Sequence, residues 1–182
     1  MGIDRHIYQK TKYPDYKIAE EFVELQKTVL VEQIKLAHKY KKSLILHNRE
    51  AKKDVLEILT NHQSLITNHS AVFHCCEPDT DLLKFAKDHK MFIGVDGDIT
   101  YYKAKQEWIK TVPLEMLVLE TDSPFLTPRF NRIQPAFAKA TARQSEPKNI
   151  PLIAEFVARL KNISVEEVGR RTTENAQILF RL

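Results

Sequence analysis

The chain has 182 residues, of which 43% are hydrophobic and 29% charged, a composition typical of one globular domain and unlike that of a disordered chain. A complete (β/α)8 barrel usually needs about 250 residues and is rarely shorter than about 200, so a whole barrel is not expected. No apolar run reaches the roughly 18–20 residues that cross a bilayer, and we expect a cytoplasmic protein without a membrane partner. The two cysteines, Cys75 and Cys76, are adjacent and cannot crosslink distant segments, which fits a reducing compartment.

The net charge of +4 is unevenly distributed. Residues 1–127 contain 18 basic and 19 acidic side chains, whereas residues 128–182 contain 10 and 5. Five of the basic residues lie in one irregular stretch: Arg129, Arg132, Lys139, Arg143 and Lys148. Such a cluster would suit the phosphates of a polyanion, although a solvated surface loop would carry the same charge.

Apolar periodicity predicts a helix first and then alternating strands and helices. The pattern over 18–40 has helical spacing, whereas the later apolar runs of about five residues are too short for helices. The predicted order after the first helix is strand 43–47, helix 51–61, strand 71–75, helix 79–89, strand 91–95, a short helix around Trp108, and strand 117–121. This alternation predicts four parallel strands in βαβ units, and therefore an α/β fold.

The C-terminal part has a different pattern. A long loop containing five prolines runs from Pro124 to Pro151, and loops of that length usually have a function or are mobile. Two helices are predicted after it, over 152–160 and over 174–180, the second beginning behind Thr172 and Thr173. Ser164 and Glu167 form a capping box, in which each side chain bonds the other's backbone N–H.

Three of the four predicted strands end in a residue that can bind a metal ion or transfer a proton, namely His47, His74 and Asp122. The carboxyl ends of parallel strands open onto one face, so these residues should meet although they are far apart in sequence. Two imidazoles and a carboxylate suit zinc, manganese or a site that also accepts magnesium. Such an ion polarises a phosphoryl oxygen and lowers the pKa of a bound water. The pattern therefore predicts hydrolysis.

Two neighbouring residues extend this candidate site. Arg49 stands two positions beyond His47, so on an extended strand it shares the same face and could hold a phosphate. An ion pair between Arg49 and Glu50 or another carboxylate is the alternative. Glu120 precedes Asp122 by two positions and should point to the same side, either as a partner of a metal ligand or as a buried acid. The two cysteines are interpreted as packing residues.

Sequence words along the whole chain resemble the TatD family of metal-dependent deoxyribonucleases, which belongs to the amidohydrolase-like barrel group. The resemblance is to about the C-terminal two thirds of the family. The words are Gly2-Ile3-Asp4, Gln26 with Gln33, Leu46-His47-Asn48-Arg49, Phe73-His74-Cys75, the block from Leu119 through Glu120-Thr121-Asp122-Ser123-Pro124 to Pro128, Ile163 to Val168, and Thr172-Thr173-Glu174-Asn175-Ala176.

The resemblance implies one TatD-like domain over residues 1–182, folded as a partial TIM-like (β/α) barrel that contains about the C-terminal half of the strands. It also implies two divalent ions (Mg, Mn or Zn) in the complete enzyme and hydrolysis of DNA phosphodiester bonds, commonly as an exonuclease. By position, His47 and His74 resemble the pair that holds one ion. Asp122 resembles the carboxylate that contacts the other ion and the attacking water, so the resemblance implies that it is the catalytic residue. Asn149 resembles a polar residue of the substrate loop.

Two family features are missing from the sequence. The family has a His-x-His pair on its first strand and a bridging Glu in a Gly-Glu-x-Gly-Leu-Asp word, and this chain starts at Met1 directly after the place of that Glu. We therefore expect weak or no nuclease activity from this chain by itself. A gene model that starts too late, a split enzyme with a separate N-terminal half, and self-association across open sheet edges would each explain the pattern.

Two other functions remain open from the sequence. The first is another metal-dependent amidohydrolase, acting on an amide or an ester. The second is a catalytically dead half-barrel, an interaction or nucleic-acid-binding module that holds DNA through residues 128–148.

Overall fold

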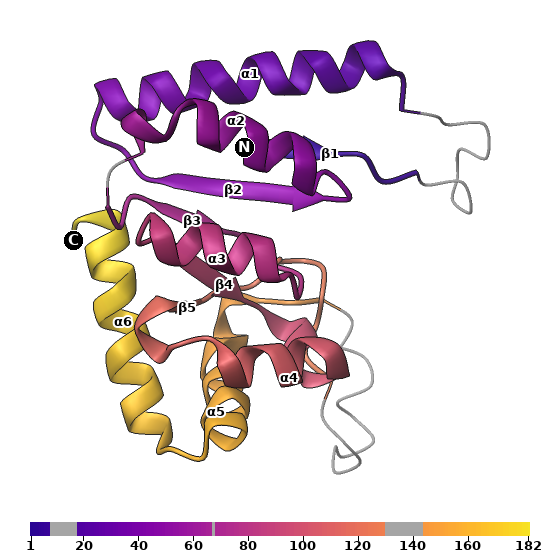
Figure 1. Ribbon diagram of the computed structural model, residues 1–182. Helices are drawn as coiled ribbons and strands as arrows, with labels where there is room; N and C mark the ends of the chain where they lie inside the picture. The colour runs from indigo at the N-terminus through magenta and orange to yellow at the C-terminus, as the bar shows by residue number, and fades with distance from the viewer. Residues whose placement is uncertain (8–17, 67, 130–143) are drawn as a thin grey trace.

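The computed structural model describes residues 1–7, 18–66, 68–129 and 144–182 (Figure 1). The strands are β1 (Gly2–Asp4), β2 (Leu44–Arg49), β3 (Ala71–Phe73), β4 (Phe92–Val95) and β5 (Leu117–Leu119). The α-helices are α1 (Glu20–Lys39), α2 (Lys52–Asn61), α3 (Thr80–Asp88), α4 (Lys103–Thr111), α5 (Ile150–Lys161) and α6 (Val165–Phe180). The predicted α/β alternation is confirmed.

The strands form one parallel sheet in the order β1-β2-β3-β4-β5, which is also their order in the sequence. Successive addition of strands on the same side is the topology of part of a (β/α) barrel. The prediction of four strands was wrong by one, because Gly2–Asp4 pairs with His47–Arg49. That pairing also extends β2 beyond His47, which was predicted to end the strand.

The two faces of the sheet carry different side chains. One face presents residues such as Leu46, Phe73 and Ile93, which are buried in the main core beneath the helices. The opposite face carries a smaller apolar cluster of Val72, Phe92 and Val118, which Leu179 of α6 covers. Side chains alternate along a strand, so this second face is also the face of His74, Gly94 and Glu120.

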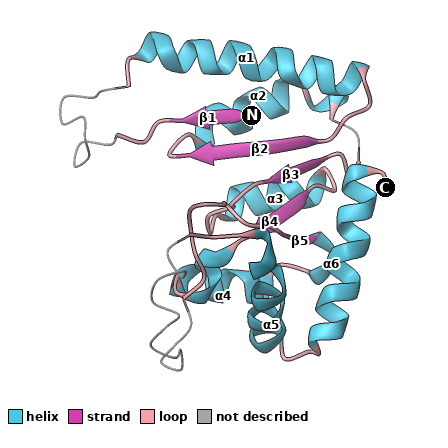
Figure 2. Cartoon of the chain, turned by 180° about the vertical axis from the view of Figure 1, so that it is seen from behind, coloured by secondary structure: helices cyan, strands magenta, loops and turns pink. Residues whose placement is uncertain are grey.

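Helix α6 lies beside the end of the sheet at which the strands begin (Figure 2). The Asn175 side chain donates to the carbonyl oxygens of Leu114 and Leu117 at 3.0 and 2.7 Å. The expected separate last helix is wrong, because α6 continues from Val165 through both threonines. The Thr172 hydroxyl donates to the Val168 carbonyl, so its polar atom is satisfied inside the helix.

Two of the α-helices, α3 and α6, begin with a side-chain cap. Ser164 caps α6 by accepting a hydrogen bond from the Glu167 backbone N–H, which is the serine half of the predicted capping box, whereas the Glu167 carboxylate accepts from Arg170. Asp79 caps α3 in the same way through Asp81 and Leu82. In the part of the chain that the structure describes, no helix has both the length and the apolar character needed to cross a membrane.

Candidate active site

His47, His74 and Gly94 lie next to one another at the carboxyl ends of β2, β3 and β4. The pairing of Leu46 with Phe73, and of Phe73 with Ile93, places each following residue beside its neighbour. His74 also donates its backbone N–H to the Leu46 carbonyl. The predicted meeting of the two histidine-bearing strand ends is therefore present in the sheet register.

Glu120 fixes the orientation of the His74 ring. Its carboxylate lies 2.9 Å from His74 Nδ1 and accepts the Cys75 backbone N–H at 2.5 Å. Glu120 reaches His74 over Gly94, where a Cβ would lie 2.2 Å from Glu120 Oε1. A carboxylate on Nδ1 leaves Nε2 to face outward, which is how metal-binding histidines are usually oriented.

Each of the two histidines also faces an aspartate through Nε2. His74 Nε2 lies 3.4 Å from Asp122 Oδ1, and His47 Nε2 lies 3.4 Å from Asp4 Oδ2. Both separations exceed the roughly 2.7–3.2 Å of a good hydrogen bond. Two ligand atoms that share a tetrahedral ion at about 2.0–2.2 Å are roughly 3.4 Å apart. The residues of both pairs therefore fit a divalent ion in donor type and spacing.

Arg49 and Asn149 are the other predicted site residues. Arg49 is half-buried on β2 opposite Asp4, and Asn149 lies in the short turn Pro147–Asn149 that leads into α5. In the described part of the chain, His47, His74 and Asp122 do not form a set of ligand atoms all within 4.8 Å. Their metal-binding roles, and the substrate roles of Arg49, Glu120 and Asn149, stay predictions.

Only the ends of the basic stretch can be located. Arg129 donates its backbone N–H to the Thr100 hydroxyl at 2.7 Å, and its guanidinium lies 4.2 Å from the centre of the Tyr101 ring. Lys148 pairs with Glu146 at 2.7 Å. The other three residues, Arg132, Lys139 and Arg143, lie outside the described residues.

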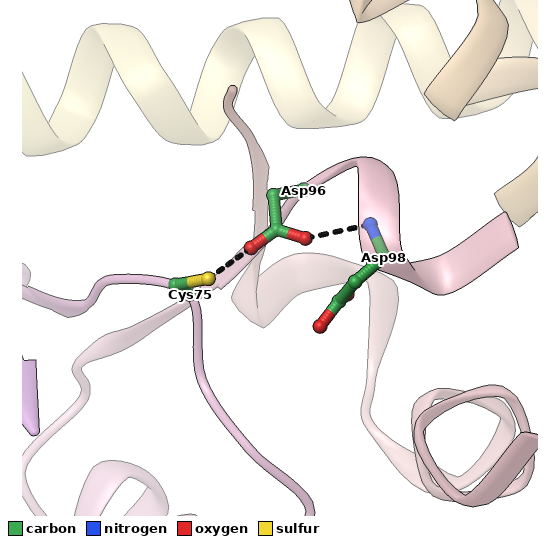
Figure 3. Close-up of side chains that lie close together, drawn as sticks. All are labelled: Cys75, Asp96 and Asp98. Atoms are coloured by element: carbon green, nitrogen blue, oxygen red, sulfur yellow. Dashed lines mark hydrogen bonds between the residues drawn. The ribbon is translucent and has the colours of Figure 1, made fainter. Parts of the chain in front are cut away.

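A second cluster of polar residues was missed by the sequence reasoning. Cys75, Asp96 and Asp98 bring a thiol and two carboxylates together within 4.8 Å (Figure 3). The Cys75 thiol donates to Asp96, whose other oxygen accepts the Asp98 backbone N–H at 2.9 Å. Asp96 directly follows the third predicted strand, so its position at a strand end was the available signal.

The ammonium group of Lys105 already balances part of the negative charge of this cluster. Lys105 and Asp96 are fully buried, and Lys105 Nζ lies 2.7 Å from Asp98 and 3.6 Å from Asp96. Burial by itself would lower the pKa of Lys105, but the charges of Asp96 and Asp98 outweigh it and raise that pKa. A metal ion would have to displace or repel this cation, so the cluster fits an ion less well than the histidine–aspartate pairs do.

The Cys75 thiol is unsuited to act as a nucleophile. Burial, together with the charge of Asp96, raises its pKa well above the usual range of a cysteine. The reactive form of cysteine is the thiolate, and it is disfavoured here. Cys76 is buried in the core as a packing residue, which agrees with the sequence-based interpretation.

A comparison with family models matches residues 1–181 to the description "TatD related DNase". The chain belongs to the TatD-related DNase family. Curated relatives of the chain include the metal-dependent hydrolase YabD of Bacillus subtilis, which is 31% identical over all of this chain and 64% of its own length. The metal-dependent hydrolase YcfH of Escherichia coli K12 is 30% identical over 92% of this chain and 60% of its own length.

Solved TatD structures have the same fold. The TatD homolog YJJV of Escherichia coli K12 has a TM-score of 0.76 at 24% identity, covering all of this chain and 62% of that one. A TatD family hydrolase of Entamoeba histolytica has a TM-score of 0.74 at 21% identity, covering 99% and 61%. The chain therefore spans about three fifths of the length of these relatives, and its fold is a partial TatD barrel.

Replacing Glu120 by Gln is expected to lower the pKa of His74. The hydrogen bond to Glu120 is the largest cause that raises this pKa, whereas Asp122 contributes less. Because the pKa of His74 is higher in the folded than in the unfolded chain, the His74–Glu120 contact adds to the free energy of unfolding below about pH 6.5. This contribution is lost as the pH rises through the folded-state pKa of His74. An NMR titration of the His74 ring would measure the shift. Asp122→Asn should lower the pKa less, and an equal or larger effect of that variant would contradict this ranking.

Replacing Gly94 by Ala is expected to displace Glu120 without unfolding the chain, since the new methyl group meets only the movable end of that side chain. The loss of support for His74 should weaken Mn²⁺ binding by about tenfold, measured by calorimetry. Gly169→Ala is the matched control, because a Cβ there meets nothing within 4 Å in α6. It should leave Mn²⁺ binding unchanged and raise the free energy of unfolding by about 0.5–1 kcal/mol. Equal Mn²⁺ affinities in the two variants would contradict the role of Glu120.

Proposed function

We propose that this chain carries part of the active site of a metal-dependent hydrolase that cleaves DNA phosphodiester bonds. The observation that carries the proposal is the pairing of His74 with Asp122 and of His47 with Asp4, each at 3.4 Å, at the carboxyl ends of parallel strands. The family description supports DNA as the substrate. The metal-dependent hydrolases among the relatives support a resident ion.

Divalent ions (Mg, Mn or Zn) would be held by His47, His74 and Asp122, with two ions in the complete enzyme. Once bound, an ion polarises the phosphoryl oxygen and makes a water molecule acidic enough to attack at neutral pH. The residues of this chain supply the rest of the chemistry. Glu120 keeps His74 Nδ1 hydrogen-bonded, so that Nε2 faces the reaction centre.

Asp122 is the proposed proton acceptor for the attacking water. Its side chain is 35% exposed, so solvent and substrate can reach the carboxylate, and the turn that follows it holds Phe125 N–H against the Asp122 carbonyl at 2.6 Å. Arg49 and Asn149 are proposed to bind phosphate groups of the substrate. Arg129 lies further along the same loop as Asp122 and would contact a phosphate group of the DNA backbone.

The remaining ligands are proposed to come from outside these 182 residues, either from a separate N-terminal part or from a second copy of the chain. The chain covers about three fifths of its relatives, and β1 is an edge strand with only β2 as its neighbour among the described strands. An edge strand offers unpaired backbone groups to a further strand.

The purified chain should bind Mn²⁺ in calorimetry and should degrade end-labelled single-stranded DNA slowly. Added chelator should stop cleavage, and Mn²⁺ should restore it. Degradation of linear but not circular single-stranded DNA would support exonuclease action. Salt-sensitive DNA binding that chelator leaves unchanged, with no Mn²⁺ binding and no cleavage, would instead support a DNA-binding module. Cleavage of amide or ester substrates alone would support another amidohydrolase activity.

A further inference from the structure

A buried charged network lies directly behind the candidate active site, and the proposed reaction does not use it. Lys105 comes from α4, Asp96 from the end of β4, and Asp98 from the turn Gly97–Thr100. Removing charges from water is unfavourable unless they are paired and hydrogen-bonded, and a buried ion pair is weak evidence for stability in its own right. The network therefore calls for a function other than general stabilisation.

Cys75 connects this network to His74. Its thiol donates to Asp96, and its backbone N–H donates to Glu120 Oε1 at 2.5 Å. The other oxygen of Glu120 lies 2.9 Å from His74 Nδ1. An unbroken series of contacts therefore runs from the Lys105 ammonium through Asp96, Cys75 and Glu120 to the His74 ring. Figure 3 shows its central step, from the Cys75 thiol to Asp96.

The backbone of Cys75 has an unfavourable conformation, which the network would stabilise. Cys75 has a φ of 50°, in the left-handed region that residues other than glycine rarely adopt. This conformation turns the chain at the end of β3, where the Cys75 N–H meets Glu120. An anchored side chain is one way to keep a non-glycine residue there, and the anchor of the Cys75 thiol is Asp96.

We propose that Asp96 and Lys105 are positioning residues for His74: they hold Cys75 in its left-handed conformation, which aims its N–H at Glu120 and so fixes the His74 ring. The inference rests on the proposed function, in which His74 Nε2 binds the ion. Lys105 supplies the charge that keeps Asp96 an acceptor, and Asp96 supplies the contact with the thiol.

The test compares Cys75→Ala, Cys75→Gly and Asp96→Ala with the matched control Asn175→Ala, whose buried amide bonds Leu114 and Leu117 at the opposite end of β5. One readout is the NMR signal of the proton on His74 Nδ1, recorded without metal. The second is the Mn²⁺ dissociation constant, measured by calorimetry at one pH. Both report on the His74 ring, whereas the melting temperature reports on the fold as a whole.

Cys75→Ala and Asp96→Ala should broaden or remove the Nδ1 proton signal and weaken Mn²⁺ binding by about tenfold. Cys75→Gly should recover most of that affinity, because glycine adopts the left-handed conformation without an anchor. Asn175→Ala should lower the melting temperature but leave both readouts unchanged. If Asp96→Ala does not fold, the alanine and glycine variants of Cys75 still decide the matter.

Two outcomes separate this inference from the proposed function. If wild type binds Mn²⁺ and the Cys75 and Asp96 variants match Asn175→Ala in both readouts, the positioning role is overturned and the metal site stands. If the Nδ1 signal responds as expected but wild type binds no Mn²⁺, the positioning of His74 is supported and the proposed function fails.

Discussion

His74→Ala is expected to lower metal-dependent hydrolysis by at least about 100-fold, since loss of a partner of a metal ligand alone typically lowers affinity or activity by about 10–100-fold. The variant removes the imidazole that lies 3.4 Å from Asp122 and 2.9 Å from Glu120. It leaves these two carboxylates facing each other without a base between them. Initial rates on single-stranded DNA at several Mn²⁺ concentrations would measure the loss.

The matched control is His62→Ala. The His62 ring nitrogen Nδ1 lies 2.9 Å from the Ile58 carbonyl at the end of α2, away from the strand ends. The activity of His62→Ala should stay close to that of wild type. Recovery of the His74→Ala rate at high Mn²⁺ would locate the defect in ion binding. Equal rates for the two histidine variants at every Mn²⁺ concentration would rule out His74 as a ligand.

Lys105→Met is expected to lower the free energy of unfolding by about 3–5 kcal/mol, the usual effect of removing one partner of a buried ion pair. Methionine fills a similar volume, so the loss reflects charge rather than packing. Asp96 would remain fully buried without its cation, and Asp98 would lose its contact at 2.7 Å. Urea unfolding followed by circular dichroism would measure the difference.

The pH dependence of this loss distinguishes charge from packing. Burial, and then the hydrogen bond with Asp96, raise the pKa of Asp98 to about 7. A carboxyl group with a raised folded-state pKa contributes stability below its unfolded value of about 4, and that contribution is lost as the pH rises through about 7. The Lys105→Met variant should therefore be less impaired at pH 5 than at pH 8. Adding Asp96→Asn and Asp98→Asn should recover part of the stability, and a deficit that is the same at both pH values would contradict the electrostatic explanation.

Local patterns predicted most of the fold. Helices α1, α2, α3 and α5 and strands β2 to β5 lie within a few residues of the predicted ranges, because each has a clear apolar period. Strand β1 has three residues, one of them glycine, and it forms through pairing with β2 that no local pattern encodes. The break expected at Thr172 is absent, because packing and a hydrogen bond to Val168 satisfy a residue that would otherwise end a helix.

The candidate site was only partly predictable. Parallel strands bring their ends together, so His47, His74 and Asp122 could be placed on one face from the sequence. The contact between Asp4 and His47 depends on β1 and could not be foreseen. Lys105 lies two positions after Lys103 in a short helix that also contains Gln106, Glu107 and Lys110, and only the tertiary fold shows that its ammonium group is buried.

The residue types at positions 94 and 120 are expected to vary together. The carboxylate of Glu120 occupies the space that a side chain at Gly94 would fill. A larger residue at position 94 displaces the glutamate from His74 and so removes its role there, and a lineage that loses the glutamate leaves a gap that a larger residue can fill. Covariation between positions 94 and 120 would therefore report on the orientation of the His74 ring, which lies at the end of β3 and at neither of these positions.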